Sequence, residues 1–481
     1  MVSYIMNINS VFSKYKKTPF GNTLGHAKNY FLAAIATKAV GFISIPILTR
    51  LLTTEEYGIL SVFNAYSGFI VVIFTLNLHI SISRYYYEEK NDFNSFVGIS
   101  LVLVILSSAF CFSLFILFRN YFANLMNLPV RLMILFLPIT INNVFRSIYD
   151  QIKGARLETK ELSLLSTVIV YVSFGLTLFF IYRLSSDKYL GVIYSNIIIG
   201  CISTLFVCWR IKDYIQFSFS KQHIKYILSY SIPYIAYSLS GVILTSIDRI
   251  MINSRFGYSQ AGLYAFAVNI GMLFNFFTVS LNSAWIPRYF DYMNKGRYLE
   301  HDKDMEKLIR ISLFFAFCLI AFAREIGVIF SGSGFHSSLH IIPLIVIGYV
   351  FEFMTTIYQR NIGFEKRTIF LALSILSAGI INIVLNTLFL EQFGYDFAAV
   401  TTVVSYFFLL FITWFISKNI LKTHTFKLLI VFKYLTIFCF FIFLLLVIQY
   451  FFKDIVFLFF LKCSIALFFL FLLIKKKLFI Y

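Results

Sequence analysis

The sequence predicts an all-α integral membrane protein with about fourteen transmembrane helices. Of its 481 residues, 59% are hydrophobic and only 13% are charged, whereas about 25% of a typical soluble domain is charged. Sixty Phe residues and a mean hydropathy of +0.83 leave too little polar surface to cover a water-soluble globule. This composition excludes a water-exposed enzyme.

Fourteen apolar runs follow one another along the chain. A bilayer core of about 30 Å requires roughly 20 helical residues, and the runs are of that order. The first run contains Lys28 and Lys38, while Arg324 and Glu325 interrupt the ninth. The predicted spans are 24–48, 57–83, 96–118, 129–149, 162–182, 189–209, 226–252, 261–286, 308–330, 339–358, 368–390, 397–417, 429–451 and 455–474.

Lysine and arginine are unevenly distributed between alternate loops. With the N-terminus in the cytoplasm, the inside segments hold roughly 28 of them and the outside segments roughly 8, as the positive-inside rule requires. The net charge of +19 is spread over these loops and forms no basic domain, so it does not indicate nucleic-acid binding. Residues 1–21 lack the features of a cleaved signal peptide. We therefore expect both termini in the cytoplasm.

Two tracts of the chain repeat with the same spacing. Arg84 follows Gly58 by 26 residues, and Arg288 follows Gly262 by 26 residues. A shift of six spans is even, so the halves would be parallel repeats, which in transporters enclose a central cavity. Coincidence between apolar sequences is the alternative explanation.

The repeat and the loop lengths predict five segments. The largest loop, 288–307, has about 20 residues, too few for a soluble domain of about 50 residues or more. The segments are a cytoplasmic N-terminal segment (1–21), an N-lobe of six spans (22–210), a cytoplasmic linker (211–225), a C-lobe of six spans (226–417), and two final spans with a basic cytoplasmic tail (418–481).

Charged and amide side chains inside the apolar runs are the candidate functional residues. An ionised group at mid-bilayer costs a few kcal/mol or more unless it faces a cavity or a partner. Lys38 lies near the middle of the first run, and Lys28 lies nearer its cytoplasmic end. Both could line a cavity for an anion; pairing of Lys38 with a buried polar group and snorkelling of Lys28 are the alternatives. Arg146, one turn after Asn142, either lines the same cavity or anchors the helix at the interface.

Two acidic residues lie in the second half of the chain. Asp248 precedes Arg249 near the outer end of the seventh span. They form either a structural ion pair or a coupling and binding pair. Glu352, inside the tenth span, is a candidate proton or cation relay, or an ion-pair partner for Arg360 two turns later.

Asparagines form a stripe along the eighth span. Asn269, Asn275 and Asn282 recur every six or seven residues. They either line a cavity or bond to neighbouring helices. The predicted cavity contacts are Lys28, Lys38, Asn142, Arg146, Arg249, Asn269 and Asn275, and the predicted coupling residues are Asp248 and Glu352.

Motifs for catalysis and for metal binding are absent from the sequence. It has no G-x-x-x-x-G-K-[ST] loop, no H-E-x-x-H and no G-x-S-x-G. The six cysteines lie in apolar runs without a C-x-x-C pair. His336 and His340 stand four residues apart but have no carboxylate trio nearby. We expect no catalytic residue, no metal and no cofactor.

Three tracts resemble a known family. The first has Gly25, Tyr30-Phe31 and Lys38, followed by Ile45-Pro46-Ile47-Leu48-Thr49-Arg50-Leu51-Leu52-Thr53-x-x-Glu56-Tyr57-Gly58. The second is Asp248-Arg249-Ile250-Met251-Ile252, Phe256-Gly257 and Ala261-Gly262-Leu263-Tyr264-Ala265; the third is Asn382-x-x-x-Asn386, Gly394 and Ala398-Ala399-Val400-Thr401. Together they resemble the Wzx-type polysaccharide biosynthesis and O-antigen flippases of the multidrug/oligosaccharidyl-lipid/polysaccharide exporter (MOP) superfamily.

The resemblance implies a transporter and not an enzyme. Proteins of this family have two six-helix lobes and two further C-terminal helices. The resemblance implies translocation of undecaprenyl-diphosphate-linked oligosaccharide, for O-antigen or capsule, from the cytoplasmic to the periplasmic leaflet of the bacterial inner membrane by alternating access. A coupling ion, H⁺ or Na⁺, and the polysaccharide polymerase machinery are candidate further partners, and the sequence leaves open whether transport is coupled to an ion.

Three other functions compete with this interpretation. A drug or cation antiporter of the same superfamily would have twelve helices and an acidic cavity, whereas this chain has two more apolar runs, 431–450 and 455–473. A lipid II flippase would share the architecture. A membrane polysaccharide polymerase or lipid-linked glycosyltransferase would need a long outside loop, and the outside loops here have only roughly 5–12 residues.

Overall fold

The computed structural model describes residues 37–88, 92–156, 158–452 and 454–474, and within these ranges it is almost entirely helical, without a β-strand. These ranges contain 12 helices long and apolar enough to cross a membrane, or 13 if one bent pair counts as a single span. The predicted first span, 24–48, lies largely outside the described residues, which show a helix over 37–51. The all-α, multi-pass membrane fold predicted from composition is confirmed.

The described chain divides into two compact units. Unit 1 comprises the described residues up to Leu52 and those within Phe63–Ser238, and unit 2 comprises Thr53–Val62 and the described residues from Leu239 onward. Up to the middle of the chain the elements are α3 (Thr54–Thr75), η1 (Leu78–Ile80), α4 (Ser81–Glu88), α5 (Phe93–Leu117), α6 (Arg119–Met126), α7 (Val130–Ala155), α8 (Thr159–Arg183), α9 (Tyr189–Ile211), η2 (Lys212–Tyr214) and α10 (Lys221–Phe256).

Unit 2 takes the rest of the chain and the first residues of α3. Its further elements are α11 (Tyr258–Asn294), α12 (Tyr298–Ala321), α13 (Ala323–Ile329), η3 (Ser333–Ile341), α14 (Ile342–Phe364), α15 (Thr368–Phe393), α16 (Phe397–Phe415), η4 (Ile416–Ile420, a π-helical turn), α17 (Leu428–Phe451) and α18 (Ile455–Ile474).

The predicted span 57–83 is broken in the structure. Helix α3 ends at Thr75, and Leu76 and Asn77 adopt left-handed backbone conformations with φ of 47° and 51°. Asparagine tolerates this conformation better than most residues. The break is held in place because Asn77 Nδ2 donates a hydrogen bond to Ser238 Oγ at 2.8 Å and the Asn77 N–H donates to Thr75 Oγ1 at 3.2 Å. The helix resumes as η1 and α4.

Corresponding helices of the two units break at corresponding places. Helix α5 gives way to α6 at Phe118, with φ −103° and ψ 25°, and α12 gives way to α13 at Phe322, with φ −105° and ψ 17°. The bend between α12 and α13 is 64°. This is the ninth predicted span, which Arg324 and Glu325 interrupt just after the bend.

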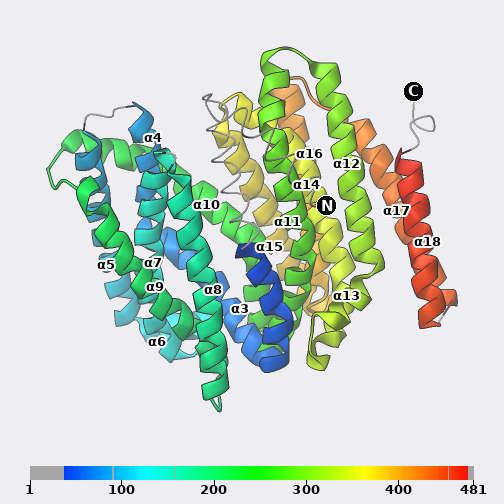
Figure 1. The fold of residues 1–481 in the computed structure, drawn as a ribbon, viewed down its shortest axis with the longest axis horizontal. Helices are drawn as coiled ribbons and strands as arrows, with labels where there is room; N and C mark the ends of the chain where they lie inside the picture. Colours follow the sequence, from blue (N-terminus) through cyan, green and yellow to red (C-terminus); the bar gives the residue numbers. More distant parts are fainter. Residues whose placement is uncertain (1–36, 89–91, 157, 453, 475–481) are drawn as a thin grey trace, which may run out of the picture. The chain divides into compact units, whose positions relative to one another are not determined.

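Helix packing also repeats. In unit 1, α9 packs against both α7 and α8, and in unit 2, α16 packs against both α14 and α15 (Figure 1). The segment η1–α4 packs on α5 and α7, as α11 packs on α12 and α14. The two parallel six-helix repeats inferred from Gly58–Arg84 and Gly262–Arg288 therefore have a counterpart in the fold.

The first turns of α3 and α11 cross at very short range within unit 2. A Cβ atom on Gly58 would lie 1.8 Å from the carbonyl oxygen of Tyr258, and one on Gly262 would lie 2.0 Å from that of Thr54. A shift of 204 residues relates Gly58 to Gly262 and also Thr54 to Tyr258, so the two contacts are equivalent. Only glycine permits this backbone approach.

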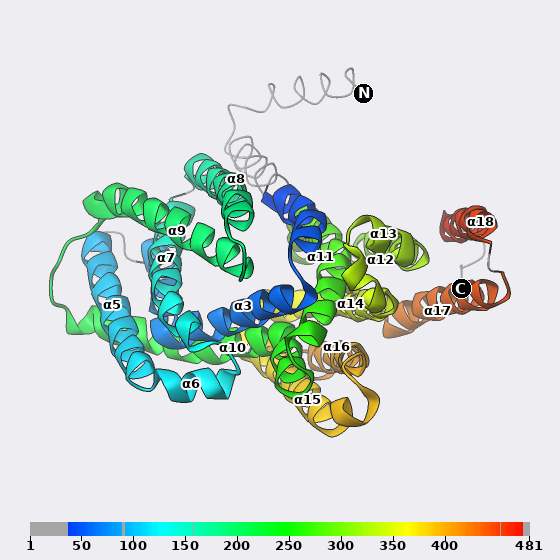
Figure 2. The ribbon, with the colours of Figure 1, turned by 90° about the horizontal axis from the view of Figure 1, so that it is seen from below.

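The last two helices pack together and against α12 (Figure 2). Arg310 of α12 donates to the Tyr434 hydroxyl of α17 at 2.9 Å and to the Leu473 carbonyl of α18 at 3.2 Å. Lys462 of α18, only 4% exposed, forms an ion pair with Glu325 of α13 at 2.6 Å. These polar contacts attach α17 and α18 to the second repeat.

Candidate functional site

A buried carboxyl group lies at the centre of a hydrogen-bonded cluster in unit 2. Asp248 of α10 is 7% exposed. Its Oδ2 accepts hydrogen bonds from Tyr264 Oη at 2.9 Å and from Thr402 Oγ1 at 2.7 Å, and its Oδ1 accepts one from Asn386 Nδ2 at 2.7 Å. The pairing with Arg249 that the sequence left open is not formed among the described residues. Three neutral donors satisfy the acid in its place.

Oxygen atoms surround this carboxyl group. Asn386 Oδ1 accepts from Thr401 Oγ1 at 2.6 Å, and Asn382 Oδ1 accepts from Asn386 Nδ2 at 3.1 Å. The carbonyl oxygen of Ala398 accepts from the hydroxyls of Thr401 and Thr402 at 2.9 Å each. We call Asp248, Tyr264, Asn382, Asn386, Thr401 and Thr402 the Asp248 cluster. Its only formal charge is that of one carboxyl group, a set suited to a proton or a hard monovalent cation.

A small cavity lies beside the Asp248 cluster. Its volume is about 30 Å³, and Asp248, Arg249, Tyr264, Tyr349 and Thr402 are among its lining residues. That is room for one or two water-sized species. Asp248 and Arg249, the predicted pair, therefore both line this cavity, although no ion pair between them is formed among the described residues.

The asparagine stripe of α11 bonds to neighbouring helices. Asn269 Nδ2 donates to the Tyr57 hydroxyl of α3 at 2.7 Å, and Asn275 Nδ2 donates to Glu352 Oε2 of α14 at 2.8 Å. Asn282 accepts a hydrogen bond from Arg360 of α14. Glu352 therefore has an amide partner, and Arg360, the partner considered for it, bonds to Asn282.

In unit 1, Arg146 of α7 is the centre of a second polar cluster inside the apolar helices. Its side chain is 21% exposed; Nε forms an ion pair with Asp150 at 2.9 Å, and Nη2 donates to Ser166 Oγ of α8 at 2.6 Å. Nη1 is buried and has no partner among the described residues. One turn earlier, Asn142 Oδ1 accepts from Thr204 Oγ1 of α9 at 2.8 Å. We call Asn142, Arg146, Asp150, Ser166 and Thr204 the Arg146 cluster.

Of the two lysines predicted to line a cavity, the structure describes only Lys38. Lys38 is partly buried in the helix over 37–51 of unit 1. Lys28 lies outside the described residues. Of the predicted cavity contacts, Lys38, Asn142 and Arg146 belong to unit 1, whereas Arg249, Asn269 and Asn275 belong to unit 2, together with Asp248 and Glu352.

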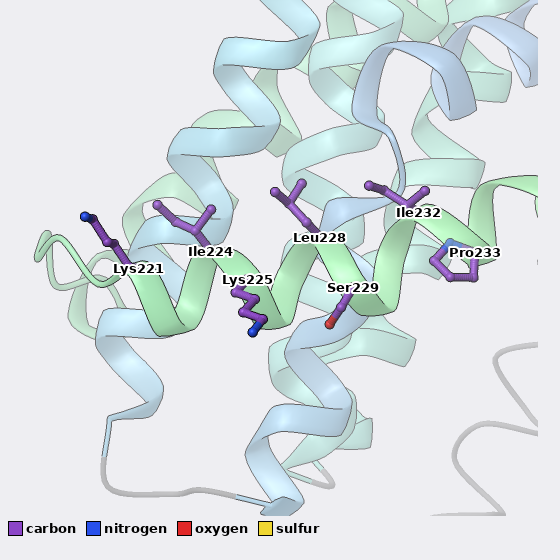
Figure 3. Close-up of a pocket in the computed structure, with 7 residues that line it drawn as sticks. All are labelled: Lys221, Ile224, Lys225, Leu228, Ser229, Ile232 and Pro233. Atoms are coloured by element: carbon purple, nitrogen blue, oxygen red, sulfur yellow. The ribbon is translucent and has the colours of Figure 1, made fainter.

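A shallow groove of about 600 Å³ runs along the first half of α10 (Figure 3). Ile224, Leu228 and Ile232 point to one side of the helix there, and Lys221 and Lys225 lie at its N-terminal end. Helix α10 has 36 residues, far more than the roughly 20 that span a bilayer core. The groove therefore combines an apolar stripe with two ammonium groups at one end.

The family model described as "Polysaccharide biosynthesis protein" matches residues 28–293, more than half of the chain. The chain belongs to the polysaccharide biosynthesis protein family. The match includes both glycines of the α3–α11 crossing and the Arg146 cluster.

Curated relatives of this polysaccharide biosynthesis protein are membrane and capsule proteins. An uncharacterized membrane protein of Haemophilus influenzae is 23% identical over 280 residues, which cover 56% of this chain and 65% of the relative. The capsular polysaccharide biosynthesis protein CapF of Staphylococcus aureus is 21% identical over 311 residues, 62% of this chain and 74% of CapF. The chain spans just under two thirds of the first relative.

Solved structures of the MOP superfamily have the same fold. The lipid II flippase MurJ in its inward closed conformation matches with a TM-score of 0.70 and 15% identity, covering 94% of this chain and 98% of MurJ. An outward-facing multidrug resistance MATE family transporter matches with a TM-score of 0.58 and 15% identity over 85% of this chain and 98% of the transporter. The polysaccharide biosynthesis protein thus has the fold of flippase-type membrane transporters.

Sequence reasoning did not assign a role to several polar residues of unit 2. Asn386 and Thr402 become visible as Asp248 partners only when α10, α15 and α16 are packed together. Lys462 was hidden because it is a single charge within the long apolar run 455–474. A lone lysine in the middle of such a run is the signal that would have identified it.

Proposed function

We propose that this protein translocates a polyprenyl-diphosphate-linked oligosaccharide, an undecaprenyl-linked precursor of O-antigen or capsule, from the cytoplasmic to the periplasmic leaflet. The Arg146 cluster carries the proposal. A guanidinium group within apolar helices is costly unless it faces a cavity or a partner, and its Nη1, which has no partner among the described residues, can donate to a phosphate oxygen. Lys28 and Lys38 would add positive charge to the same path, with both termini in the cytoplasm.

A sugar-diphosphate headgroup needs such a path. Its charges and hydroxyls would lose hydration in the hydrocarbon core at a cost of several kcal/mol per group. The amide and hydroxyl groups of Asn142, Ser166 and Thr204 beside Arg146 can replace part of that hydration. Alternating access between the two lobes would then carry the headgroup across, while the lipid tail stays in the bilayer.

The groove of α10 is a proposed contact for the lipid substrate. A phosphate beside Lys221 and Lys225, with an isoprenoid chain along Ile224, Leu228 and Ile232, would match the charge and the apolarity of the groove. Replacement of Lys221 and Lys225 together by Glu is expected to weaken substrate capture severalfold, with less effect at saturating substrate.

We further propose that the Asp248 cluster binds the coupling ion, and that this ion is Na⁺. Hard cations prefer oxygen ligands, and Asp248, Asn382, Asn386, Ala398 and Thr402 supply carboxylate, amide, carbonyl and hydroxyl oxygens from three helices. Rotation of the Asn386 amide would turn its oxygen toward the ion. Glu352, with one amide partner, is the alternative relay for H⁺.

The deciding experiment compares two complementation hosts. The protein is expressed in a strain lacking its surface-glycan flippase and in a strain lacking peptidoglycan lipid export. Restored surface glycan in the first strain only is the expected result. Rescue of the second strain only would replace the proposal by lipid II export, the function named for MurJ. Rescue of neither strain, with drug resistance gained, would favour an antiporter.

A further inference from the structure

Three potential metal ligands lie close together in unit 2. None of them belongs to the Asp248 cluster or the Arg146 cluster. His301 and Asp302 lie near the start of α12, and His424 lies in the connection from η4 to α17. Asp302 Oδ1 is 2.9 Å from His301 Nδ1 and 3.0 Å from His424 Nε2. One ligand atom of each residue lies within 4.8 Å of the other two. We call these residues the His–Asp–His cluster.

The surroundings hold these ligands in place. Asn361 Nδ2 donates to the His424 carbonyl oxygen at 3.0 Å, and the Tyr289 hydroxyl donates to Asn361 Oδ1 at 2.6 Å. The Tyr298 ring stacks on the His424 imidazole with 4.4 Å between centroids. Only 2% of His301 is exposed. Neighbouring groups therefore hold the backbone and the ring of His424, whereas the other ring nitrogen of His301, Nε2, is buried without a hydrogen-bond partner among the described residues.

The ligand set favours one class of metal. Two imidazole nitrogens and one carboxylate oxygen suit Zn²⁺, which binds nitrogen at about 2.0–2.1 Å and oxygen at about 2.0–2.2 Å. Tetrahedral ligands at those lengths lie roughly 3.4 Å apart, so the atoms of this cluster need to shift by little more than an ångström. Mg²⁺ and Ca²⁺ prefer oxygen-only sites.

We propose that His301, Asp302 and His424 form a zinc site, with water as the fourth ligand. The ion would fasten the connection 421–427 to the start of α12, the helix on which α17 and α18 pack. It would therefore stabilise the attachment of the two last helices to the second repeat. This site is independent of the proposed transport function.

The test measures zinc bound by the purified full-length protein in detergent, after removal of metal with a chelator and equilibration with Zn²⁺. Wild type should retain one Zn²⁺ per chain, and His424→Ala and Asp302→Asn should lose it. His340→Ala is the matched control, because His340 also bonds to an aspartate, Asp396 at 2.8 Å, but belongs to no three-ligand cluster among the described residues. The control should bind zinc like the wild type.

Two further readouts keep the result decisive if a variant folds poorly. Co²⁺ added to the wild type should give the intense visible absorption of a tetrahedral site, and Zn²⁺ should raise the thermal unfolding midpoint of wild type and His340→Ala but not of Asp302→Asn. The proposal is overturned if wild type binds no more zinc than Asp302→Asn, or if Co²⁺ gives only a weak octahedral spectrum. The three residues would then form a hydrogen-bonded cluster only.

Discussion

Arg146 and Asp248 are both polar groups within apolar helices, but their partners differ. Within the described ranges, Arg146 has an acidic partner, Asp150, and one nitrogen without a partner. In the part of the chain that the structure describes, the donors to Asp248 are all neutral. An arginine with spare donors can bind an anion, and an acid with neutral partners can exchange a cation. These differences underlie their separate proposed roles.

Substitution of Arg146 tests anion binding. Arg146→Gln should lower export at least tenfold, since the loss of one charge-assisted hydrogen bond is equivalent to about 1.5–3 kcal/mol. Arg146→Lys should keep part of the activity because the charge remains without the planar fork. Surface glycan measured in the complemented strain is the readout.

The matched control is Arg131→Gln. Arg131 bonds to Asp187 at 2.8 and 2.9 Å, with both side chains about half exposed, and its hydrogen bonds lower the pKa of Asp187 below its usual value. An exposed pair of this kind contributes only about 0.2–1 kcal/mol. Export equal to wild type in Arg146→Gln would contradict the role proposed for the Arg146 cluster.

The substitution Asp248→Asn tests the proposed ion coupling, because it removes the charge of the carboxylate and keeps the size of the side chain. Wild-type transport should increase severalfold with an inward Na⁺ gradient, and the variant should lose that dependence. The readout is transport in proteoliposomes with and without the gradient, and Asp187→Asn is the control acid. Stimulation by a proton gradient alone in the wild type would assign H⁺ as the coupling ion, and an unchanged Na⁺ response in Asp248→Asn would contradict the site.

Residue positions within apolar runs were predictable from the sequence, but their partners were not. Asp248, Glu352 and the asparagines were identified as polar groups in predicted spans. Their bonds depend on which helices are neighbours, and apolar runs carry no such information. His301 and His424 are more than a hundred residues apart, and no spacing motif joins them.

At the scale of elements, the close approach of α3 and α11 gives the most direct test of helix packing. Gly58→Ala or Gly262→Ala should destabilise the protein by roughly 1–3 kcal/mol, because the new methyl group would meet a backbone carbonyl at 1.8 or 2.0 Å. Thermal unfolding in detergent is the measurement. Gly175→Ala in α8, where no described residue outside its own helix turn lies within 4 Å of the added Cβ, should be neutral or stabilising. Equal effects at Gly58 and Gly175 would contradict the crossing.

The ion pair of Lys462 and Glu325 tests the attachment of α18. Lys462→Met or Glu325→Gln should lower the unfolding temperature, since each leaves the other group without its partner in a largely buried site. The double variant should recover part of the loss, giving a coupling energy of about 0.5–3 kcal/mol. Lys295→Met, which breaks the exposed pair with Asp291, is the control. Additive losses in the double variant would show that the pair is not coupled.

Element boundaries were predicted well where an apolar run ends at a charged loop. The predicted span 57–83 failed at Leu76 and Asn77, because hydropathy records composition and not backbone conformation. The interruption of the ninth run at Arg324 and Glu325 correctly indicated a break in the helix, since the helix bends at Phe322.

At the scale of the whole molecule, the parallel repeat is the feature that the sequence and the fold share. Equivalent helices pack alike in the two units, and the glycines that revealed the repeat in the sequence are those that meet at the α3–α11 crossing. Family membership and fold agree with a flippase-type transporter. The substrate proposed for it depends on side-chain chemistry that neither the repeat nor the fold encodes.

The most direct test is reconstitution of the purified protein in vesicles with a fluorescent polyprenyl-diphosphate-linked oligosaccharide, scored by the label that becomes accessible on the opposite leaflet. The wild type should move the diphosphate-linked lipid, Arg146→Gln should move it at least tenfold more slowly, and a neutral polyprenyl glycoside should not be moved. Equal movement of the neutral and the diphosphate lipids, or none of either, would contradict recognition of an anionic glycan carrier.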